Sequence, residues 1–489
     1  MTMDRRWLPI LLLAAAALIL NLSPVDQEAV AAMQRGDALA AERQYSEALA
    51  AYAAAAQRCP GCPQPHLRQG EVYVRQGRHA AAWDACLAAV RLGGDGDAAL
   101  EAKAALYMAQ GAPEWAIASL RRLLDHRPGR ADLWLRLAEA CLANGDRACA
   151  RTTWDRALGM HLTDAQRQAA HDWLGLMCLG GPGSGTACPA IDLACALAHF
   201  EQAASGPDPA LAQSGAALAA ALRAIRQGEE PALAAAKLGE VLLRREEVAL
   251  ARCQFAAAVA LEPAYVDGHT YLGHALSLLG EDETAVRHLQ RAMALEPAYP
   301  LPYYMLGMHH ARRGRWLSAR DLLLQAHDLD PANPAICAAV AETYLQAPNA
   351  LYPIAERWLH AAVDNAPADP RFHLLLARFY VEYGIDPGQR GLAAARVAAD
   401  LSPSDAGAQE TLGWAYHLSG QPARAIGPLD RARTLAPQEP RVSYRLGEVY
   451  RALGRVDQAR RFYQQAVDLD WHGPVGERAR RAMRDLGGG

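Results

Sequence analysis

Two cysteines near the N-terminus have the spacing of a reactive pair. The sequence from residue 58 reads Arg-Cys-Pro-Gly-Cys-Pro, so Cys59 and Cys62 form a C-x-x-C motif. Such a pair could be a redox dithiol, half of a zinc site, or a turn that happens to carry two cysteines. The three interpretations imply different proteins, and the elements that surround the motif decide among them.

The composition favours a large helical protein. The chain has 489 residues, of which 52% are hydrophobic, so it has enough apolar surface to form a core. Alanine is abundant, phenylalanine occurs only 5 times, and Lys103 and Lys237 are the only lysines. This mixture favours closely packed helices over sheets. The formal charge of −4 offers no general attraction for phosphate backbones, so we expect no nucleic-acid partner.

The first 23 residues differ from the rest of the chain. Arg5 and Arg6 precede an apolar run that extends from Trp7 to Leu20. We predict that residues 1–6 are a cytoplasmic basic flank and that residues 7–23 are a transmembrane anchor or a signal segment. The chain is then membrane-anchored by one N-terminal helix, with its body extracytoplasmic, in the periplasm or cell envelope. Export after signal cleavage is the alternative.

The body of the chain is a repeat. Prolines recur at intervals of 34 or 36 residues, at Pro263, Pro297, Pro331, Pro367, Pro403 and Pro437. A Leu-Gly pair lies at one fixed distance after several of these prolines, at Leu272-Gly273, Leu306-Gly307, Leu412-Gly413 and Leu446-Gly447. A second glycine follows each pair, at Gly280, Gly314, Gly420 and Gly454. Self-similarity at such a period is typical of helical-repeat architectures.

Each recurring residue has a physical reason. A small residue inside the first helix of a unit lets the neighbouring helix approach closely. Glycine is favoured where a helix ends in a left-handed conformation. Proline beyond the second helix cannot continue that helix. Each unit is therefore predicted to be a helical hairpin whose apolar face only another hairpin can cover.

The pattern resembles the tetratricopeptide repeat (TPR) family over nearly all of the chain from Ala29 to about Asp470. Recognisable units begin near residues 29, 63, 97, 131, 232, 266, 300, 334, 370, 406 and 440. The resemblance implies an all-α fold, a right-handed α-solenoid of about eleven to twelve TPR helical hairpins in two sub-arrays with a C-terminal cap helix.

We expect the body to have four parts. They are an N-terminal TPR sub-array over residues 29–164, a degenerate repeat with a Gly-rich loop and an extra helix over 165–231, a C-terminal TPR sub-array over 232–471, and a cap helix and tail over 472–489. The Gly-rich loop, residues 180–186, lacks the Gly-Lys-Ser/Thr ending of a phosphate-binding loop, so we interpret it as a connection.

The sequence contains no recognisable catalytic arrangement. It has no H-E-x-x-H motif, and the adjacent His309 and His310 diverge on a helix, so they cannot bind one metal from the same face. We assign the histidines to helix packing or to the surface. We therefore predict that the protein is not an enzyme and that it needs no cofactor and no metal.

The resemblance implies a binding surface on the first helices of the units, at positions 2, 5, 9 and 12 or 13. In this chain those positions hold Leu301, Tyr304, Met308, Arg312, Arg371, Arg378, Trp414, His417, Arg441, Tyr444, Glu448 and Arg451. Aromatic and arginine side chains are typical of peptide and protein grooves. The alternative is that Tyr304 or Trp414 packs between helices.

Two classes of function follow. The first is a non-enzymatic scaffold or adaptor that binds peptide or protein partners on the exported side of a membrane. The second is an accessory protein that supports envelope polysaccharide or glycan assembly, or secretion machinery. A thiol redox protein acting through the C-x-x-C motif is a weaker third class. The identity of the partner and the oligomeric state are not indicated by repeat positions, which specify how hairpins stack.

Eight of the ten cysteines lie at or before Cys195. An exported chain permits disulfides. Cys141 and Cys149 could bridge one hairpin, and Cys178 and Cys188 could close the Gly-rich loop. Cys59 and Cys62 lie where two hairpins meet, with no preceding strand and no second C-x-x-C motif, so we predict a local disulfide or two thiols in a turn.

Overall fold

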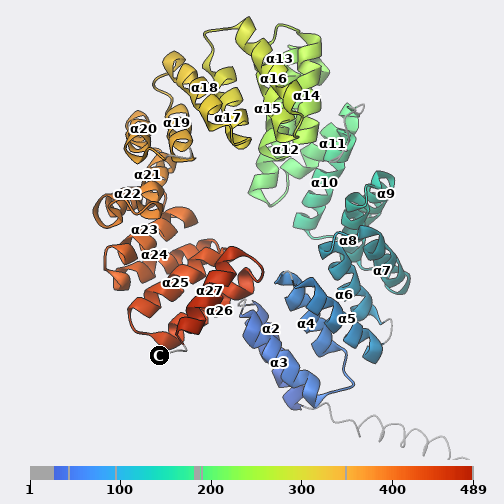
Figure 1. Cartoon of the computed structure of the whole chain (residues 1–489). Helices are drawn as coiled ribbons and strands as arrows, with labels where there is room; N and C mark the ends of the chain where they lie inside the picture. The colour runs from blue at the N-terminus through green and yellow to red at the C-terminus, as the bar shows by residue number, and fades with distance from the viewer. Residues whose placement is uncertain are drawn as a thin grey trace, which may run out of the picture. The chain divides into compact units, whose positions relative to one another are not determined.

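The computed structural model describes residues 27–41, 44–76, 78–93, 96–180, 188, 191–228, 230–346 and 350–486 (Figure 1). Within these ranges every regular element is helical. Each helix packs mainly against its neighbours along the chain, as expected for a stack of hairpins. The protein is therefore an all-α solenoid, as the repeat pattern predicts.

The helices belong to two compact units. Unit 1 combines residues from both ends of the chain and contains α2 (Gln27–Ala41), α3 (Tyr45–Arg58), α4 (Gln64–Arg75), α5 (His79–Gly93), α6 (Asp97–Ala109), α7 (Pro113–His126), α25 (Pro440–Ala452), α26 (Val456–Leu469) and α27 (Pro474–Asp485).

Unit 2 is the central part of the chain, Gly129–Pro437. It contains α8 (Ala131–Ala143), α9 (Arg147–Leu158), α10 (Asp164–Cys178), α11 (Leu193–Ala204), α12 (Pro209–Gln227), α13 (Pro231–Arg244), α14 (Val248–Leu261), α15 (Val266–Leu278), α16 (Asp282–Leu295), α17 (Pro300–Arg312), α18 (Trp316–Leu329), α19 (Pro334–Gln346), α20 (Tyr352–Asn365), α21 (Pro370–Glu382), η2 (Pro387–Gly391), α22 (Leu392–Leu401), α23 (Ala406–Leu418) and α24 (Pro422–Leu435). The division into two sub-arrays around residues 165–231 stays a prediction.

The hairpin of α15 and α16 shows how the repeat residues act. Gly280 ends the first helix with a φ of +82°, a conformation that other residues rarely adopt. A Cβ atom at Gly273 would lie 2.6 Å from Cγ of Leu289, so only glycine allows this approach between the two helices. Ala285 and Ala292 on the second helix are fully buried. The short turn and the small residues therefore set the spacing of the hairpin.

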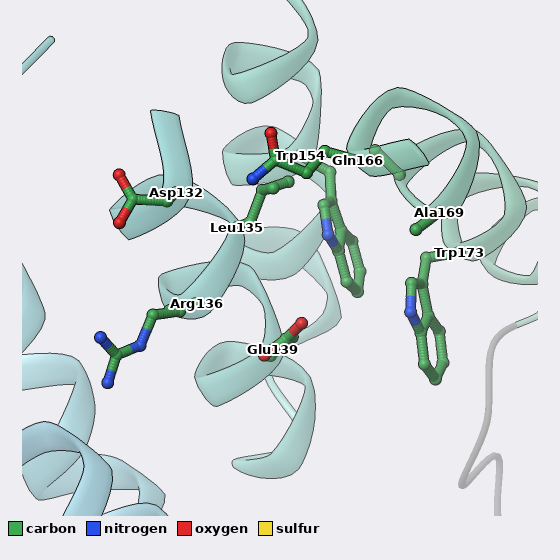
Figure 2. A pocket seen from close by; sticks show the side chains of 9 residues that line it. Asp132, Leu135, Arg136, Glu139, Trp154, Gln166, Ala169 and Trp173 are labelled. Atoms are coloured by element: carbon green, nitrogen blue, oxygen red, sulfur yellow. The ribbon is translucent and has the colours of Figure 1, made fainter. Parts of the chain in front are cut away.

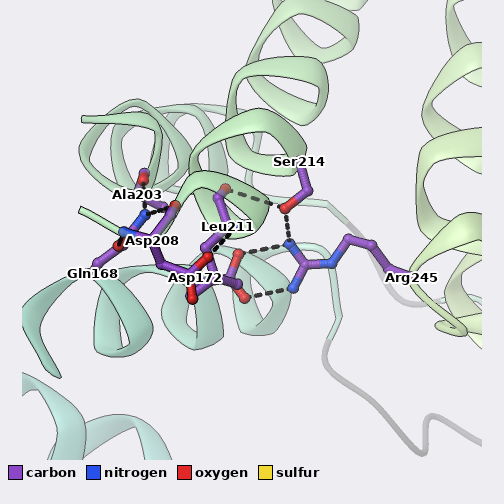
Figure 3. Close-up of polar contacts among 7 residues, drawn as sticks. All are labelled: Gln168, Asp172, Ala203, Asp208, Leu211, Ser214 and Arg245. Carbon is purple, nitrogen blue, oxygen red and sulfur yellow. Dashed lines mark hydrogen bonds and ion pairs between the residues drawn. The ribbon is translucent and has the colours of Figure 1, made fainter. Parts of the chain in front are cut away.

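The helix α12 has no partner in the repeat pattern and is held by polar contacts (Figure 3). The side-chain amide of Gln168 on α10 donates to the carbonyl oxygens of Ala203 and Asp208, at 2.9 and 3.0 Å, and its oxygen accepts from the Asp208 backbone N–H. The Asp208 carboxylate accepts from the backbone N–H groups of Ala210 and Leu211. Asp208 thus caps the start of α12, and its contacts with Gln168 join α12 to α10.

An ion pair connects α10 to the turn after α13. The Arg245 guanidinium donates to both carboxylate oxygens of Asp172, at 2.7 and 2.5 Å, and also to Ser214 Oγ on α12 at 3.0 Å (Figure 3). The exposed fraction of Asp172 is only 4%. Two parallel N–H···O bonds compensate the buried carboxylate with an opposite charge.

Within unit 1, the first described hairpin contacts the last one. Asp468 on α26 has an exposed fraction of 1%. Its carboxylate accepts from the backbone N–H and the hydroxyl of Ser46 on α3, at 3.1 and 2.7 Å. The side-chain amides of Gln76 and Gln464 also donate to it, at 3.3 and 3.0 Å. In the same region, the Arg78 guanidinium lies 3.8 Å from the ring centre of Trp471.

Four disulfides are present in the described residues. They join Cys59 to Cys62, Cys141 to Cys149, Cys178 to Cys195, and Cys188 to Cys253. The expected closure of the Gly-rich loop by Cys178 and Cys188 is therefore wrong. The hairpin turn brings the first turn of α11 opposite the end of α10, so Cys195 meets Cys178, whereas Cys188 reaches Cys253 on α14. Cys86 and Cys337 are buried thiols.

Several predictions concern residues outside the described ranges. The basic flank at 1–6, the apolar segment at 7–23 and most of the Gly-rich loop belong to this group. None of the helices in the described ranges combines the length and the apolar character that a membrane span requires.

Candidate binding grooves

A cavity of about 490 Å³ lies along three successive first helices of unit 2, α17, α19 and α21. We call it the α19 groove. Its lining residues are Tyr304, Met308, Ala335, Ala338, Ala339, Glu342, Leu345, Gln346, Leu359, Arg371, Phe372, Leu375, Arg378, Phe379, Glu382 and Tyr383. The cavity is large enough for side chains of a bound peptide.

The repeat register places these side chains. On α19, Ala335, Ala338 and Glu342 occupy the second, fifth and ninth positions of the unit that begins at residue 334. Residues three or four apart share one face of a helix, so such positions point to the same side. The short side chains of Ala335 and Ala338 leave the floor of the groove open between the longer side chains of α17 and α21.

Exposed apolar groups form one wall of the α19 groove. Leu375 is 41% exposed and Tyr383 is 39% exposed, although both are large hydrophobic side chains. The Tyr383 ring lies 5.8 Å from the ring of Phe379, which is buried and fixes its neighbour. Burying such groups against a ligand releases water and gives the largest favourable term in peptide binding.

Charged groups flank this apolar wall. Arg371 pairs with Asp369 at 2.6 Å, and the hydrogen bond lowers the pKa of the Asp369 carboxyl. Arg378 also lies on α21, whereas Glu342 belongs to α19. Burial raises the pKa of the Tyr304 hydroxyl, so this group stays a neutral hydrogen-bond donor at physiological pH. The groove therefore offers apolar contacts with charges of both signs at its edges.

A second cavity, of about 300 Å³, lies between α8 and α10 (Figure 2). We call it the Trp pocket. Trp154 on α9 and Trp173 on α10 stack with ring centres 5.8 Å apart and an interplanar angle of 7°. Asp132 forms a two-bond ion pair with Arg130, whose hydrogen bonds lower the pKa of the Asp132 carboxyl. The remaining lining residues are Leu135, Arg136, Glu139, Gln166, Ala169 and Ala170.

The predicted binding-surface residues of unit 2 fall into two groups, those that line the α19 groove and those that do not. Tyr304, Met308, Arg371 and Arg378 line the α19 groove together. The other four, Leu301, Arg312, Trp414 and His417, are not part of its lining. Whether any of these residues binds a ligand is untested.

Arg312, Trp414 and His417 have contacts within the protein. Arg312 donates to Nδ1 of His274 at 3.4 Å, and burial, assisted by this arginine, lowers the pKa of His274 to about 4. The rings of Trp414 and His417 stack at 4.7 Å, and Trp414 packs against the buried cluster around Phe379. For Trp414, the structure thus shows the alternative that the sequence left open, packing between helices.

The four predicted residues in unit 1 also contact their own unit. Glu448 is buried and accepts from Tyr463 Oη at 2.7 Å and from Arg451 at 2.5 Å. The Arg478 guanidinium on α27 lies 5.5 Å from the ring centre of Tyr444. Arg441 lies in the first turn of α25, where its N–H donates to Glu439. The contacts of Glu448 with Tyr463 and of Tyr444 with Arg478 hold α25 against α26 and α27.

The residues predicted from the sequence include neither the Trp pocket nor the floor of the α19 groove. The same register would have found them, since Asp132, Leu135 and Glu139 are positions 2, 5 and 9 of the unit that begins at 131. The degenerate unit near 165 continues the pattern with Gln166, Ala169 and Trp173. The predicted binding positions were taken only from the units that begin at residue 300 and later, although the same positions recur in these earlier units.

One group in the described residues could hold a metal ion. Ligand atoms of Cys178, Cys195 and His199 all lie within 4.8 Å of one another. The sequence predicts no metal site, and its pattern places the histidines in helix packing or at the surface. This group is not part of either cavity.

Family models cover three stretches of the chain. Residues 28–97 and 419–474 match one tetratricopeptide repeat model, and residues 107–174 match another. These three stretches are similar to tetratricopeptide repeats. Proteins built from these repeats generally mediate protein–protein interactions. A search of curated proteins finds no match.

Solved structures of helical-repeat proteins are similar to this chain. Yeast Tom70 is 15% identical, with 94% of this chain and 95% of that chain covered and a TM-score of 0.40. Cut9 in its complex with Hcn1 is 14% identical, with 88% and 98% covered and a TM-score of 0.41. YrrB, described as a TPR protein with an unusual peptide-binding site, is 18% identical, with 37% and 92% covered and a TM-score of 0.31.

Proposed function

We propose that the protein is a non-enzymatic scaffold that binds an extended peptide segment of a partner protein in the α19 groove. One observation carries this proposal. Three successive first helices present exposed apolar and aromatic side chains, with arginine and glutamate at the edges, around a single cavity of about 490 Å³. A peptide with apolar anchors and charges of both signs fits this lining better than a small polar ligand.

Leu375 is the residue that tests this groove most directly. Its side chain is 41% exposed, so replacing it disturbs the core little, yet it belongs to the apolar wall. The matched control is Leu317 on α18, which is 64% exposed and lies outside the groove lining. Each leucine is changed to serine, so both variants lose the same apolar group.

Peptides are selected from a random displayed library on the full chain, and the Kd of the best peptide is measured by fluorescence anisotropy. We expect Leu375→Ser and Arg378→Ala each to weaken binding by about tenfold or more, which corresponds to ~1.4 kcal/mol per tenfold. Leu317→Ser should leave the Kd within about twofold. Equal affinities of all four proteins, or equal losses in both leucine variants, would rule out the α19 groove as the binding site.

We also propose that the array acts on the exported side of a membrane, held there by residues 7–23. The proposal is supported by the Arg5-Arg6 flank before the apolar run and by four disulfides, which an oxidising compartment permits. A reporter enzyme that is active only outside the cytoplasm is fused after residue 489. Activity is expected for the full chain and not after deletion of residues 1–23, and a silent full-length fusion contradicts the proposed topology.

A further inference from the structure

A cysteine–histidine cluster lies between α10 and α11, in the degenerate hairpin of unit 2. Cys178 is the last residue of α10, and Cys195 and His199 lie on α11. Cys178 is buried, and the other two residues are partly buried. The ligand atoms of all three lie within 4.8 Å of one another, which is close enough for one ion to contact them together.

The spacing of these residues places them on facing sides of the two helices. Cys195 and His199 are four residues apart, so they share one face of α11. His171 and Cys178 are seven residues apart, which is two turns of α10, so they also share a face. The antiparallel hairpin then brings the two faces together.

The backbone holds the two cysteines near each other independently of their sulfur atoms. The backbone N–H of Asp192 donates to the carbonyl oxygen of Cys178 at 2.9 Å, and the Asp192 carboxylate accepts from the Cys195 N–H at 3.1 Å. A Cβ atom at Gly175 would lie 2.7 Å from the Phe200 ring, so glycine lets α10 and α11 approach closely. The cluster is therefore preorganised by the hairpin.

A second histidine orients the first. The Nδ1 atoms of His171 and His199 lie 2.9 Å apart, so one of them carries a proton and donates to the other. Nε2 of His199 can bind a metal when Nδ1 of His199 is the donor in this hydrogen bond, because Nε2 then carries no proton. A metal-binding histidine is commonly fixed by a hydrogen bond at its other ring nitrogen, and His171 supplies that contact here.

A positive charge lies beside the cluster. The Arg151 guanidinium donates to Cys195 Sγ at 3.6 Å. A nearby cation stabilises a thiolate, which is the form of cysteine that binds a metal. Two thiolates and one neutral imidazole form a soft donor set whose charge of −2 balances that of a divalent ion.

We propose that the reduced chain binds one zinc ion through Cys178, Cys195 and His199, with His171 as a positioning residue. Thiolate and imidazole ligands favour zinc among the common divalent ions of the cell. Three protein ligands leave one position of a tetrahedral site for water or for a further group. The Cα atoms of the two cysteines are 5.8 Å apart, and rotation of their side chains serves either a disulfide or two bonds to one ion.

Reduction of the disulfide precedes metal binding. A dithiol reductant supplies two electrons and two protons to the Cys178–Cys195 disulfide, whose S–S bond breaks to give two thiols while the reductant becomes a disulfide. Zinc then forms two Zn–S bonds and one Zn–N bond, and the two thiol protons pass to solvent. The site is independent of the proposed peptide groove, whose lining shares no residue with it.

Cobalt(II) is the probe for this site. The full chain is reduced with a phosphine, freed of metal, and titrated with Co²⁺ while the thiolate-to-cobalt charge-transfer band and the d–d bands are recorded. We expect one equivalent of tetrahedral Co²⁺, displaced by Zn²⁺. Alkylation of the thiols, mapped by mass spectrometry with and without Zn²⁺, should show protection of Cys178 and Cys195.

Cysteine and histidine variants assign the ligands. The double variant Cys178→Ser, Cys195→Ser should lose the charge-transfer band, and His199→Asn should weaken Zn²⁺ binding by at least about tenfold in chelator competition. The matched control is Cys141→Ser, Cys149→Ser, which removes another pair of unit 2 that has no third ligand beside it in the described residues. This control should keep the full signal.

His171 has its own test because it acts through His199. His171→Gln is expected to lower the Zn²⁺ affinity by ~10–100-fold while the tetrahedral Co²⁺ spectrum is retained. If the reduced wild-type chain gives no such spectrum, or if the Cys178/Cys195 double variant gives the same one as wild type, the zinc site does not exist. Equal alkylation of Cys178 and Cys195 with and without Zn²⁺ contradicts it in the unaltered chain.

Discussion

Two buried aspartates join segments that are distant in the sequence, and the protein stabilises them in different ways. In unit 2, Asp172 receives two hydrogen bonds from the Arg245 guanidinium, so an opposite charge compensates it. In unit 1, Asp468 receives hydrogen bonds from the neutral groups of Ser46, Gln76 and Gln464. Burial raises the pKa of Asp468 even though the bonds from Ser46 and Gln464 lower it.

The two aspartates should therefore respond differently to mutation and to pH. A compensated pair is sensitive to the loss of its partner, because one charge then remains buried alone. A carboxylate surrounded by neutral donors is sensitive to pH, since protonation removes a charge that burial disfavours. Three predictions test this contrast, and a fourth compares both aspartates with the α19 groove.

The largest effect is expected from Arg245→Met. The change keeps an apolar stem but leaves Asp172, which is 4% exposed, without its charged partner. We expect a loss of about 3–5 kcal/mol in the free energy of unfolding, measured by urea titration. Arg223→Met is the control, because Arg223 and Glu201 form an ion pair whose side chains are 50% and 43% exposed. That control should cost less than about 1 kcal/mol, and equal losses would refute the comparison.

A smaller loss is expected from Asp468→Ala. The change removes the acceptor shared by Ser46, Gln76 and Gln464, whose donors are neutral, and Ser46 and Gln464 are only partly buried. We expect a loss of about 1–3 kcal/mol, again by urea titration. Asp457→Ala on the same helix changes an exposed aspartate and serves as control. A loss larger than that of Arg245→Met would show that neutral donors matter more than the ion pair.

The contribution of Asp468 to the stability of the fold is expected to fall as the pH rises. Its pKa is raised in the folded chain, so the folded state binds the proton more tightly than the unfolded state. The contribution of Asp468 to the free energy of unfolding is most favourable below the ordinary aspartate pKa of about 4. This contribution is lost as the pH rises through the folded-state pKa. The stability of wild type relative to Asp468→Asn should therefore fall over this range. A difference that is constant, or that rises with pH, contradicts the raised pKa.

The smallest effect on stability is expected in the α19 groove. Leu375→Ser removes an apolar side chain that is already 41% exposed, so the free energy of unfolding should change by at most about 0.5 kcal/mol. Leu359→Ala, at a residue that is 4% exposed on the other side of the same cavity, should cost about 2–5 kcal/mol. A large loss for Leu375→Ser would mean that this residue belongs to the core.

The repeat residues were enough to predict the fold because they act locally. Gly280 ends a helix through its own backbone conformation, and Gly273 admits its neighbour because it lacks a side chain. Such effects recur at a fixed period, so they are visible in one sequence. The candidate groove was predictable only in part, since the register gives the facing side of a helix but not which cavities remain open. Met308 lines a cavity, whereas Trp414, at the same position of a later unit, packs against buried neighbours.

The sequence by itself determined the helical hairpins and their length, because short-range spacing and backbone preferences specify each unit. The tertiary structure decided that Cys178 meets Cys195 and Cys188 meets Cys253, which aspartates are buried, and how Cys178, Cys195 and His199 converge. These features depend on side chains 17 to 422 residues apart in the chain. Their proximity follows from how hairpins stack, and no local pattern around any one of these residues encodes it.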